Sequence, residues 1–201
     1  MSDYLVGITG GIACGKSNLT AALKSSGVPV VDADKVSHSL TTDNGEALPY
    51  LRKAFGDGIF DGETLNRKRL GQMIFSNPEK RKQLNAVLHP MILQRIRAEV
   101  DRTPGIVFMD VPLLFECGMD TWCDEVWCAY VPQKEQIARL RQRDGITRKA
   151  AVQKIRAQMS GLEKARRADH VIRTDGSTEE SSRIVLSLYQ QLKERLTQHG
   201  A

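Results

Sequence analysis

The chain has 201 residues, of which 41% are hydrophobic and 26% charged, and its formal net charge is +5. This length suits one α/β domain with a modest insertion, and the composition is that of a soluble globular protein. Because the sequence has no apolar run of about 18 residues and no secretory signal pattern, we expect a cytoplasmic protein that does not span a membrane. The cysteines show no zinc-site spacing and are expected to be free thiols.

The first predicted strand, Leu5–Ile8, leads into the glycine-rich run Gly10–Ser17, which matches G-x-x-x-x-G-K-[ST]. An amphipathic helical pattern follows, so the motif lies between a strand and a helix, as a phosphate-binding loop requires. Glycines let backbone N–H groups approach phosphate, and the helix N-terminus adds partial positive charge. Lys16 can reach the β- and γ-phosphates, and Ser17 can ligate Mg²⁺. The residues expected to bind the nucleotide are Gly11, Ile12, Ala13, Cys14, Gly15, Lys16 and Ser17.

The same loop contains a cysteine. The helix N-terminus and Lys16 are expected to lower the pKa of the Cys14 thiol and make it reactive.

The second predicted strand, Val28–Val31, ends at two acidic residues, Asp32 and Asp34. In a parallel α/β sheet, side chains just beyond the carboxyl end of a strand face the ligand crevice. One carboxylate there can accept the proton of an attacking hydroxyl, while the other organises Mg²⁺ or a basic neighbour. Asp is also a preferred helix N-cap. Position therefore predicts that at least one of the two is catalytic and leaves open which.

The long segment Lys35–Arg102 has a helical pattern throughout, with apolar faces such as Leu70–Phe75. Pro78 suits the first turn of a helix, and Pro90 is predicted to start another. We therefore expect a helical insertion that forms a substrate-side subdomain. From the residues alone, His89 is better explained as structural than as catalytic.

The third predicted strand, Ile106–Asp110, is an apolar run that ends in aspartate, the form of a Walker B element. Asp110 there can hold Mg²⁺ directly or through water. It can equally cap the segment that follows. The residues leave both interpretations open.

The fourth predicted strand, Glu125–Val131, precedes a basic stretch from Arg139 to Arg167, and the fifth, His170–Arg173, precedes a covering helix over Glu179–Leu196. Most charge runs of this kind are solvated helix faces. Beside a phosphate loop, an arginine-bearing lid that closes over the phosphates is favoured. The five short apolar strands, separated by helical patterns, predict a buried parallel sheet.

Several short motifs, in this order and spacing, resemble those of the dephospho-coenzyme A kinase family along nearly the whole chain. They are Thr9–Ser17, Val31–Asp34, Leu65–Leu70, Ile74–Pro78, Leu88–Pro90 and Asp110–Glu116, and Arg139–Asp144 with Ala157–Met159 fall where the lid of that family lies. The sequence departs from the family pattern at Ala13 and Cys14, where Gly and Ser are usual, and at Thr174–Gly176, where Asn-x-Gly is frequent.

The resemblance implies an α/β P-loop NTPase fold, with a three-layer core around a five-stranded parallel sheet (residues 1–34, 103–138 and 168–201). To this it adds a helical coenzyme A-binding subdomain (35–102) and a helical lid (139–167). The implied reaction is the last step of coenzyme A biosynthesis, in which ATP, with Mg²⁺, phosphorylates the ribose 3′-hydroxyl of dephospho-coenzyme A.

The resemblance also implies a role for particular residues. Asp34 would be the general base, Lys16 would stabilise the transferring phosphoryl group and Arg143 would close over the phosphates. Ser17 would hold Mg²⁺, together with Asp110 if that residue is a Walker B aspartate. The residues that would line or support the acceptor are Asp34, Arg67, His89 and Leu113.

Three other functions compete with this interpretation. Another small P-loop kinase, acting on a nucleotide or a small alcohol, is disfavoured by the helical insertion and by the Pro112–Glu116 turn. A GTPase-like switch would carry N-K-x-D and D-x-x-G, which the sequence lacks. An RNA-binding module would need aromatic platforms, yet only 5% of the chain is aromatic. We therefore expect a small-molecule substrate, no nucleic-acid or membrane partner, and a monomer or weak homo-oligomer.

Overall fold

The computed structural model describes residues 2–199. The chain divides into two compact units, one formed by Met1–Val30 with Thr103–Ala201 and the other by Val31–Arg102. Within residues 2–199, no helix is both long enough and apolar enough to cross a membrane.

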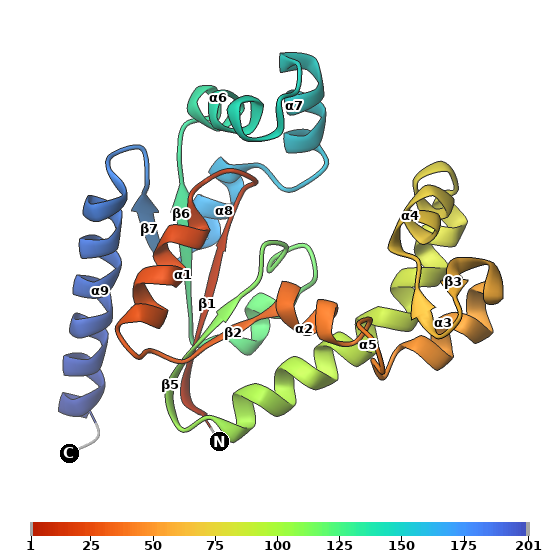
Figure 1. Ribbon diagram of the computed structural model, residues 1–201. Coiled ribbons are helices and arrows are strands. Elements are labelled where there is room, and N and C mark those ends of the chain that lie inside the picture. Colours follow the sequence, from red (N-terminus) through yellow and green to blue (C-terminus); the bar gives the residue numbers. More distant parts are fainter. Residues whose placement is uncertain (1, 200–201) are drawn as a thin grey trace. The chain divides into compact units, whose positions relative to one another are not determined.

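The first unit is built on a five-stranded sheet in the order β2-β5-β1-β6-β7 (Figure 1). Its strands are β1 (Ser2–Gly10), β2 (Val30–Asp32), β5 (Gly105–Asp110), β6 (Glu125–Tyr130) and β7 (His170–Arg173). Central β1 pairs in parallel with β5 and β6, and β6 pairs in parallel with β7. The edge strand β2 carries the chain across the boundary between the units. All five predicted strands and the predicted parallel sheet are confirmed.

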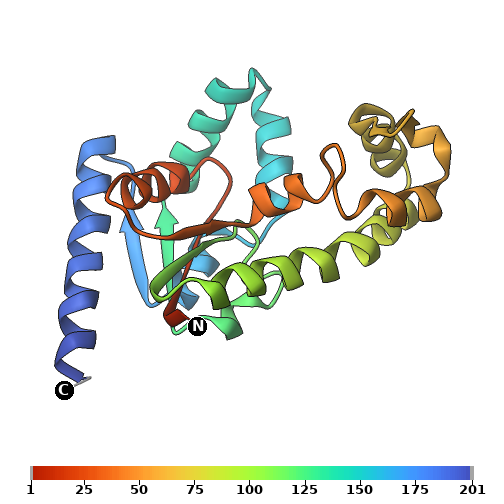
Figure 2. The same ribbon diagram turned by 60° about the horizontal axis from the view of Figure 1, so that its bottom comes forward.

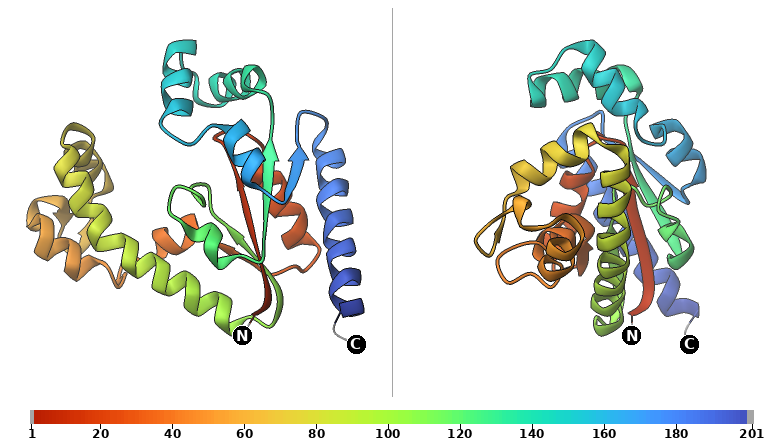
Figure 3. Two further views of the ribbon diagram at one scale, coloured as in Figure 1. Left: turned by 180° about the vertical axis from the view of Figure 1, so that it is seen from behind. Right: turned by 90° about the vertical axis from the view of Figure 1, so that its right-hand side faces the viewer.

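Helices cover both faces of this sheet. The helices α1 (Lys16–Ser25) and α9 (Thr178–His199) lie together on one face, and α8 (Gly161–Arg167) lies on the other (Figures 1 and 3). The core beneath α1 and α9 is apolar and includes Val6, Ile8 and Phe108, all fully buried. The predicted C-terminal covering helix is confirmed.

Two further helices follow β6. They are α6 (Gln133–Asp144) and α7 (Arg148–Arg156), which form a hairpin through Gly145, whose φ of 64° is left-handed (Figure 2). The pair has its own small apolar cluster of Leu140, Ala151 and Ile155. Ile12 from the loop after β1 packs against that cluster. The hairpin is therefore fastened to the loop by side-chain packing.

The second unit is mostly helical. Its helices are α2 (Ala33–Ser39), α3 (Leu48–Phe55), the short 3-10 helix η1 (Asp57–Ile59), α4 (Arg67–Ser76) and α5 (Pro78–Arg102). The expectation of helix throughout Lys35–Arg102 is wrong at β3 (Phe60–Asp61) and β4 (Thr64–Leu65), which pair as an antiparallel hairpin. Gly62 and Glu63 form the two-residue connection, and Gly62, at φ 63°, supplies the positive φ that such a hairpin turn needs.

The longest helix, α5, runs unbroken from Pro78 to Arg102 (Figure 2). Pro78 stands at its first position, as predicted. Pro90, however, lies inside the helix, so the predicted helix start there is wrong. An interior proline costs about 3 kcal/mol, but Leu84 and Ile96 on either side of it are buried. Packing of those side chains holds the helix together across the proline.

Candidate functional site

The loop between β1 and α1 forms a tight cradle. The N–H of Cys14 donates to the carbonyl of Gly11 at 3.1 Å, and Gly15 adopts a left-handed conformation at φ 77° as α1 begins. Ala13 is also left-handed, at φ 60°, although it carries a side chain. The first turn of α1, all of which is described, contains no acidic residue. Its unsatisfied N–H groups and partial positive charge therefore remain available for an anion.

Close approach explains two of the loop glycines. A Cβ on Gly10 would lie 2.8 Å from the carbonyl oxygen of Ala129 in β6, and one on Gly11 would lie 2.6 Å from Nε2 of Gln136 in α6. The loop therefore passes directly against β6 and α6: at Gly10 the backbone of β6 leaves no room for a Cβ, and at Gly11 a Cβ would displace the Gln136 side chain.

Lys16 forms an ion pair with Asp110. Asp110 is the last residue of β5, and it lies opposite Ile8 in the register of the neighbouring strand β1. The two side chains are 16% and 8% exposed, so solvent screens the pair only weakly. The strand end therefore presents a carboxylate to the phosphate-loop lysine.

A cleft of about 340 Å³ opens beside the loop. Its walls come from the phosphate loop and the first turn of α1, from α6, and from the connection between β7 and α9 with the start of α9: Ala13, Gly15, Ser17, Asn18, Arg139, Arg143, Thr174, Gly176, Thr178 and Ser181. None of these lining residues, all within the described part of the chain, is acidic. Two guanidinium groups and a helix N-terminus make the cleft attractive to a polyanion.

Arg139 and Thr174 fix the inner wall of the cleft. Nη2 of Arg139 donates to the carbonyl of Thr174 at 2.8 Å, and Nε of Arg139 contacts Glu135 at 2.9 Å. The buried Thr174 hydroxyl donates to the carbonyl of Cys14 at 2.5 Å. The Thr174–Gly176 segment, where the sequence departs from the family pattern, is thus bonded directly to the phosphate loop.

Arg143 lines the same cleft from the last turn of α6. Its Nε donates to Asp144 at 2.8 Å, and Asp144 also accepts from Lys154 of α7 at 2.7 Å. These hydrogen bonds from Arg143 and Lys154 lower the pKa of Asp144 to about 2. Asp144 is therefore charged at neutral pH and pairs with Arg143 at the C-terminal end of α6.

In the second unit, the side chains of Asp32 and Asp34 have different surroundings. Asp32 is the N-cap of α2, and its side chain accepts the N–H of Lys35 at 3.1 Å. Asp34 lies in the first turn of α2 and is exposed. The cap that the sequence could assign to either residue falls on Asp32.

The other expected acceptor residues lie on three different elements. Nη2 of Arg67, at the start of α4, donates to the carbonyl of Thr41 at 3.1 Å and so joins α4 to the end of α2. His89 is exposed on α5. Leu113, in the first unit, follows β5 and is 38% exposed. Arg67 and His89 belong to one unit and Leu113 to the other.

The expectation of a reactive thiol at Cys14 is wrong. The side chain points into the core and the residue is 1% exposed. Burial raises the pKa of the Cys14 thiol above its usual value, and the hydrogen bonds and nearby cations that favour the thiolate do not compensate. The motif predicted proximity to positive charge but not the direction in which the side chain points.

Sequence patterns did not identify several polar contacts around the loop. Nε2 of Gln136 donates to the carbonyl of Ile12 at 2.7 Å, and the N–H of Ile12 donates to Oε1 of Gln158 at 3.3 Å. Lys164 is fully buried and donates to the carbonyl of Pro112 at 2.6 Å. Gln158 belongs to the lid motif and Lys164 to the basic stretch, but neither pattern indicated the partner, and Gln136 carried no signal.

A family model described as dephospho-CoA kinase matches residues 4–180. A dephospho-CoA kinase of Geobacillus kaustophilus is 40% identical over 192 residues, which covers 92% of this chain and 95% of that protein. Among solved structures, TT1252 of Thermus thermophilus is 33% identical with a TM-score of 0.80, covering 96% of this chain and 99% of that one. Dephospho-CoA kinase of Campylobacter jejuni is 26% identical with a TM-score of 0.71, covering 94% of this chain and 97% of that one. The resemblance drawn from the motifs is confirmed, and the chain belongs to the dephospho-CoA kinase family.

Proposed function

We propose that this chain transfers the γ-phosphoryl group of ATP to the ribose 3′-hydroxyl of dephospho-coenzyme A, giving ADP and coenzyme A. The observation that carries the proposal is the cleft beside the phosphate loop, where the guanidinium groups of Arg139 and Arg143 share the lining with the N-terminus of α1, which begins at Lys16. The positive charge of this site suits a polyphosphate. Membership of the family identifies dephospho-coenzyme A as the acceptor.

Phosphoryl transfer asks the protein mainly for positioning and for positive charge around the transferring group. The N–H groups of residues 11–17 hold the β- and γ-phosphates, with the N-terminus of α1 behind them. Lys16 exchanges its contact with Asp110 for the phosphoryl oxygens, where its charge counts most in the transition state. Arg143, already at the cleft, neutralises the same oxygens from the lid side.

Mg²⁺ fits the residues at this site. The Ser17 hydroxyl lines the cleft, and the Asp110 carboxylate contacts the loop lysine. Hydroxyl and carboxylate oxygens are the hard donors that Mg²⁺ combines with water and substrate phosphates. When bound, Mg²⁺ neutralises charge on the β- and γ-phosphate oxygens.

Asp34 is assigned the general base, which accepts the proton of the 3′-hydroxyl as that oxygen attacks phosphorus. Its exposed place directly after a strand end favours it over Asp32, whose carboxylate caps α2. Arg67, His89 and Leu113 are assigned to binding or supporting the acceptor. Residues 35–102 are assigned to the acceptor subdomain, and residues 139–167 to the lid.

The test measures ADP release with ATP, Mg²⁺ and one acceptor at a time: dephospho-coenzyme A, nucleoside monophosphates or shikimate. We expect turnover with dephospho-coenzyme A alone, and phosphorus NMR of the product should show a 3′-phosphate monoester. Lys16→Ala should lose most turnover, whereas Lys24→Ala, on the exposed side of α1, should not. Turnover with shikimate or a nucleotide but not with dephospho-coenzyme A would contradict the proposal.

A further inference from the structure

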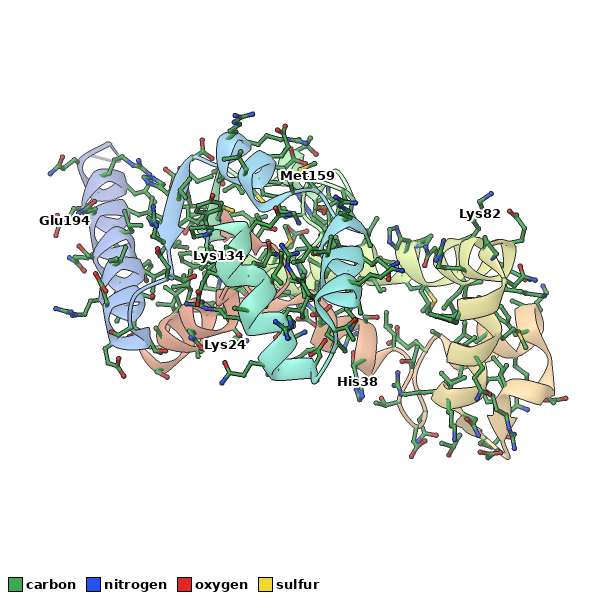
Figure 4. All side chains as sticks on the ribbon, turned by 90° about the horizontal axis from the view of Figure 1, so that it is seen from above. Lys24, His38, Lys82, Lys134, Met159 and Glu194 are labelled. Atoms are coloured by element: carbon green, nitrogen blue, oxygen red, sulfur yellow. The ribbon has the colours of Figure 1, made fainter. Side chains whose placement is uncertain are left out.

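Ile12 is the point at which the phosphate loop meets the hairpin of α6 and α7. Its side chain packs on the Leu140, Ala151 and Ile155 cluster. Both polar groups of its backbone bind glutamine side chains: the carbonyl accepts from Gln136 and the N–H donates to Gln158. Gln136 lies in the first turn of α6 and Gln158 directly after α7. Figure 4 labels their neighbours, Lys134 on α6 and Met159.

The two glutamine contacts differ in strength. Gln136 is 3% exposed, its hydrogen bond is 2.7 Å long, and it lies directly against Gly11. Gln158 is only partly buried, and its bond of 3.3 Å exceeds the common range for N–H···O. The contact with Gln136 is therefore fixed, and the contact with Gln158 is the weaker of the two.

The Ile12 N–H is also one of the loop donors that the proposed function assigns to the nucleotide phosphates. A backbone N–H has one proton, so the amide oxygen of Gln158 and a phosphate oxygen compete for it. A charged phosphate oxygen forms a hydrogen bond roughly twice as strong as that of a neutral amide. We propose that Gln158 is a positioning residue that occupies the Ile12 N–H until a nucleotide phosphate displaces it, so that filling the loop releases the Gln158 side chain. This inference rests on the ATP-binding part of the proposed function.

The surrounding contacts confine the exchange to Gln158. The next residue, Met159, donates its N–H to Glu116 at 2.9 Å, and the fully buried Lys164 holds the same carboxylate at 2.9 Å. Glu116 therefore anchors the chain just beyond Gln158, while Gln136 anchors the start of α6. Only the contact of Gln158 has to be given up when phosphate enters.

Competition between Gln158 and phosphate predicts the direction in which the affinity for ATP changes when Gln158 is replaced. ATP must break the contact with Gln158, so removing the side chain should strengthen ATP binding. A neutral hydrogen bond corresponds to about a 2- to 10-fold change in affinity. We therefore expect Gln158→Ala to lower the Kd for Mg·ATP by about that factor, with the KM for dephospho-coenzyme A unchanged. Gln158→Glu, which adds charge beside the phosphates, should raise the Kd instead.

The experiment combines two measurements, both made without acceptor. Calorimetry gives the Kd for Mg·ATP, and NMR monitors hydrogen exchange of the Ile12 amide. In Gln158→Ala, the Ile12 amide should exchange faster than in the wild type when ATP is absent and equally slowly when it is present. Gln153→Ala, which removes an exposed glutamine of α7, is the matched control and should change neither measurement. Weaker ATP binding by Gln158→Ala, or unchanged exchange at Ile12, would overturn the inference. If the wild type does not bind ATP, the proposed function itself fails; if it binds ATP and the Gln158 variants match it, only this inference fails.

Discussion

The hydroxyl of Thr174 donates a buried hydrogen bond to the carbonyl of Cys14, at 2.5 Å. The carbonyl of Thr174 accepts in turn from Arg139 of α6. Thr174, the first residue after β7, thus connects the phosphate loop to Arg139 of the cleft. Its hydroxyl binds the loop, and its backbone carbonyl binds the arginine.

Replacing Thr174 should separate these two contacts. Thr174→Val keeps the shape but leaves the buried carbonyl of Cys14 without its donor, which costs about 1–3 kcal/mol. Thr174→Ser keeps the donor and should cost less. Urea unfolding gives the free energies of unfolding, and the KM for ATP should rise in the valine variant. Equal stability of the two variants would show that the hydroxyl contributes nothing.

A second prediction separates the two aspartates after β2. Asp34→Asn should lower kcat by about 100-fold or more, because it removes a general base, while the KM for ATP changes little. Asp32→Asn is the matched control, since asparagine caps a helix as well as aspartate does. Near-normal turnover in Asp34→Asn would remove it as the base, and a loss confined to Asp32→Asn would transfer the role to Asp32.

The elements that sequence patterns predicted are those fixed by local chemistry. Short apolar runs form strands because a strand that is buried on both faces of its sheet needs apolar side chains at nearly every position. The run Gly10–Ser17 became a cradle because its glycines stand where neighbouring atoms leave no room for a Cβ. In both cases the residue types themselves indicate the local backbone, and the contacts of the loop glycines with Ala129 and Gln136 add a tertiary reason for glycine there.

The errors have a common cause in tertiary packing. Pro90 is a helix breaker by itself, yet buried side chains on both sides of it keep α5 continuous. Cys14 lies near positive charge, yet its direction into the core decides its pKa. Gln136 and Gln158 reach the loop only because α6 and α7 fold back over it. No periodicity or motif contains that information.

A third prediction concerns the lid arginine. Arg143→Ala should lower kcat by roughly 100-fold, the usual effect of losing one transition-state donor. Arg141→Ala, also exposed on α6 but outside the cleft lining, should leave kcat unchanged. Because the pKa of Asp144 is lowered to about 2, its pair with Arg143 is complete at any pH well above that value. The kcat of the wild type should therefore show no inflection from Asp144 between about pH 5 and 9, and a loss equal in both variants would rule out a specific role for Arg143.

A fourth prediction concerns Glu125, at the opposite end of β6 from the lid. Glu125 is 8% exposed, accepts from Nε1 of Trp127 at 3.0 Å and forms an ion pair with Arg195. Burial alone would raise the pKa of Glu125, but the hydrogen bonds from Trp127 and Arg195 outweigh it, so the pKa is lowered. A carboxylate whose pKa is lowered by folding stabilises the protein above its unfolded pKa, near 4.3, and loses that contribution as the pH falls through the folded value.

Glu125→Gln should therefore reduce the free energy of unfolding at pH 7 by about 1.5–3 kcal/mol, the range for hydrogen bonds to a charged group. The difference from the wild type should shrink as the pH falls below about 4. Glu194→Gln, an exposed site on α9 that Figure 4 labels, should have little effect at either pH. Urea unfolding at several pH values measures the difference, and one that stays constant down to pH 3 would mean that the charge of Glu125 is not its source. Turnover at pH 7 should be unchanged, because Glu125 stands where β6 begins and the cleft lies beyond the strand ends.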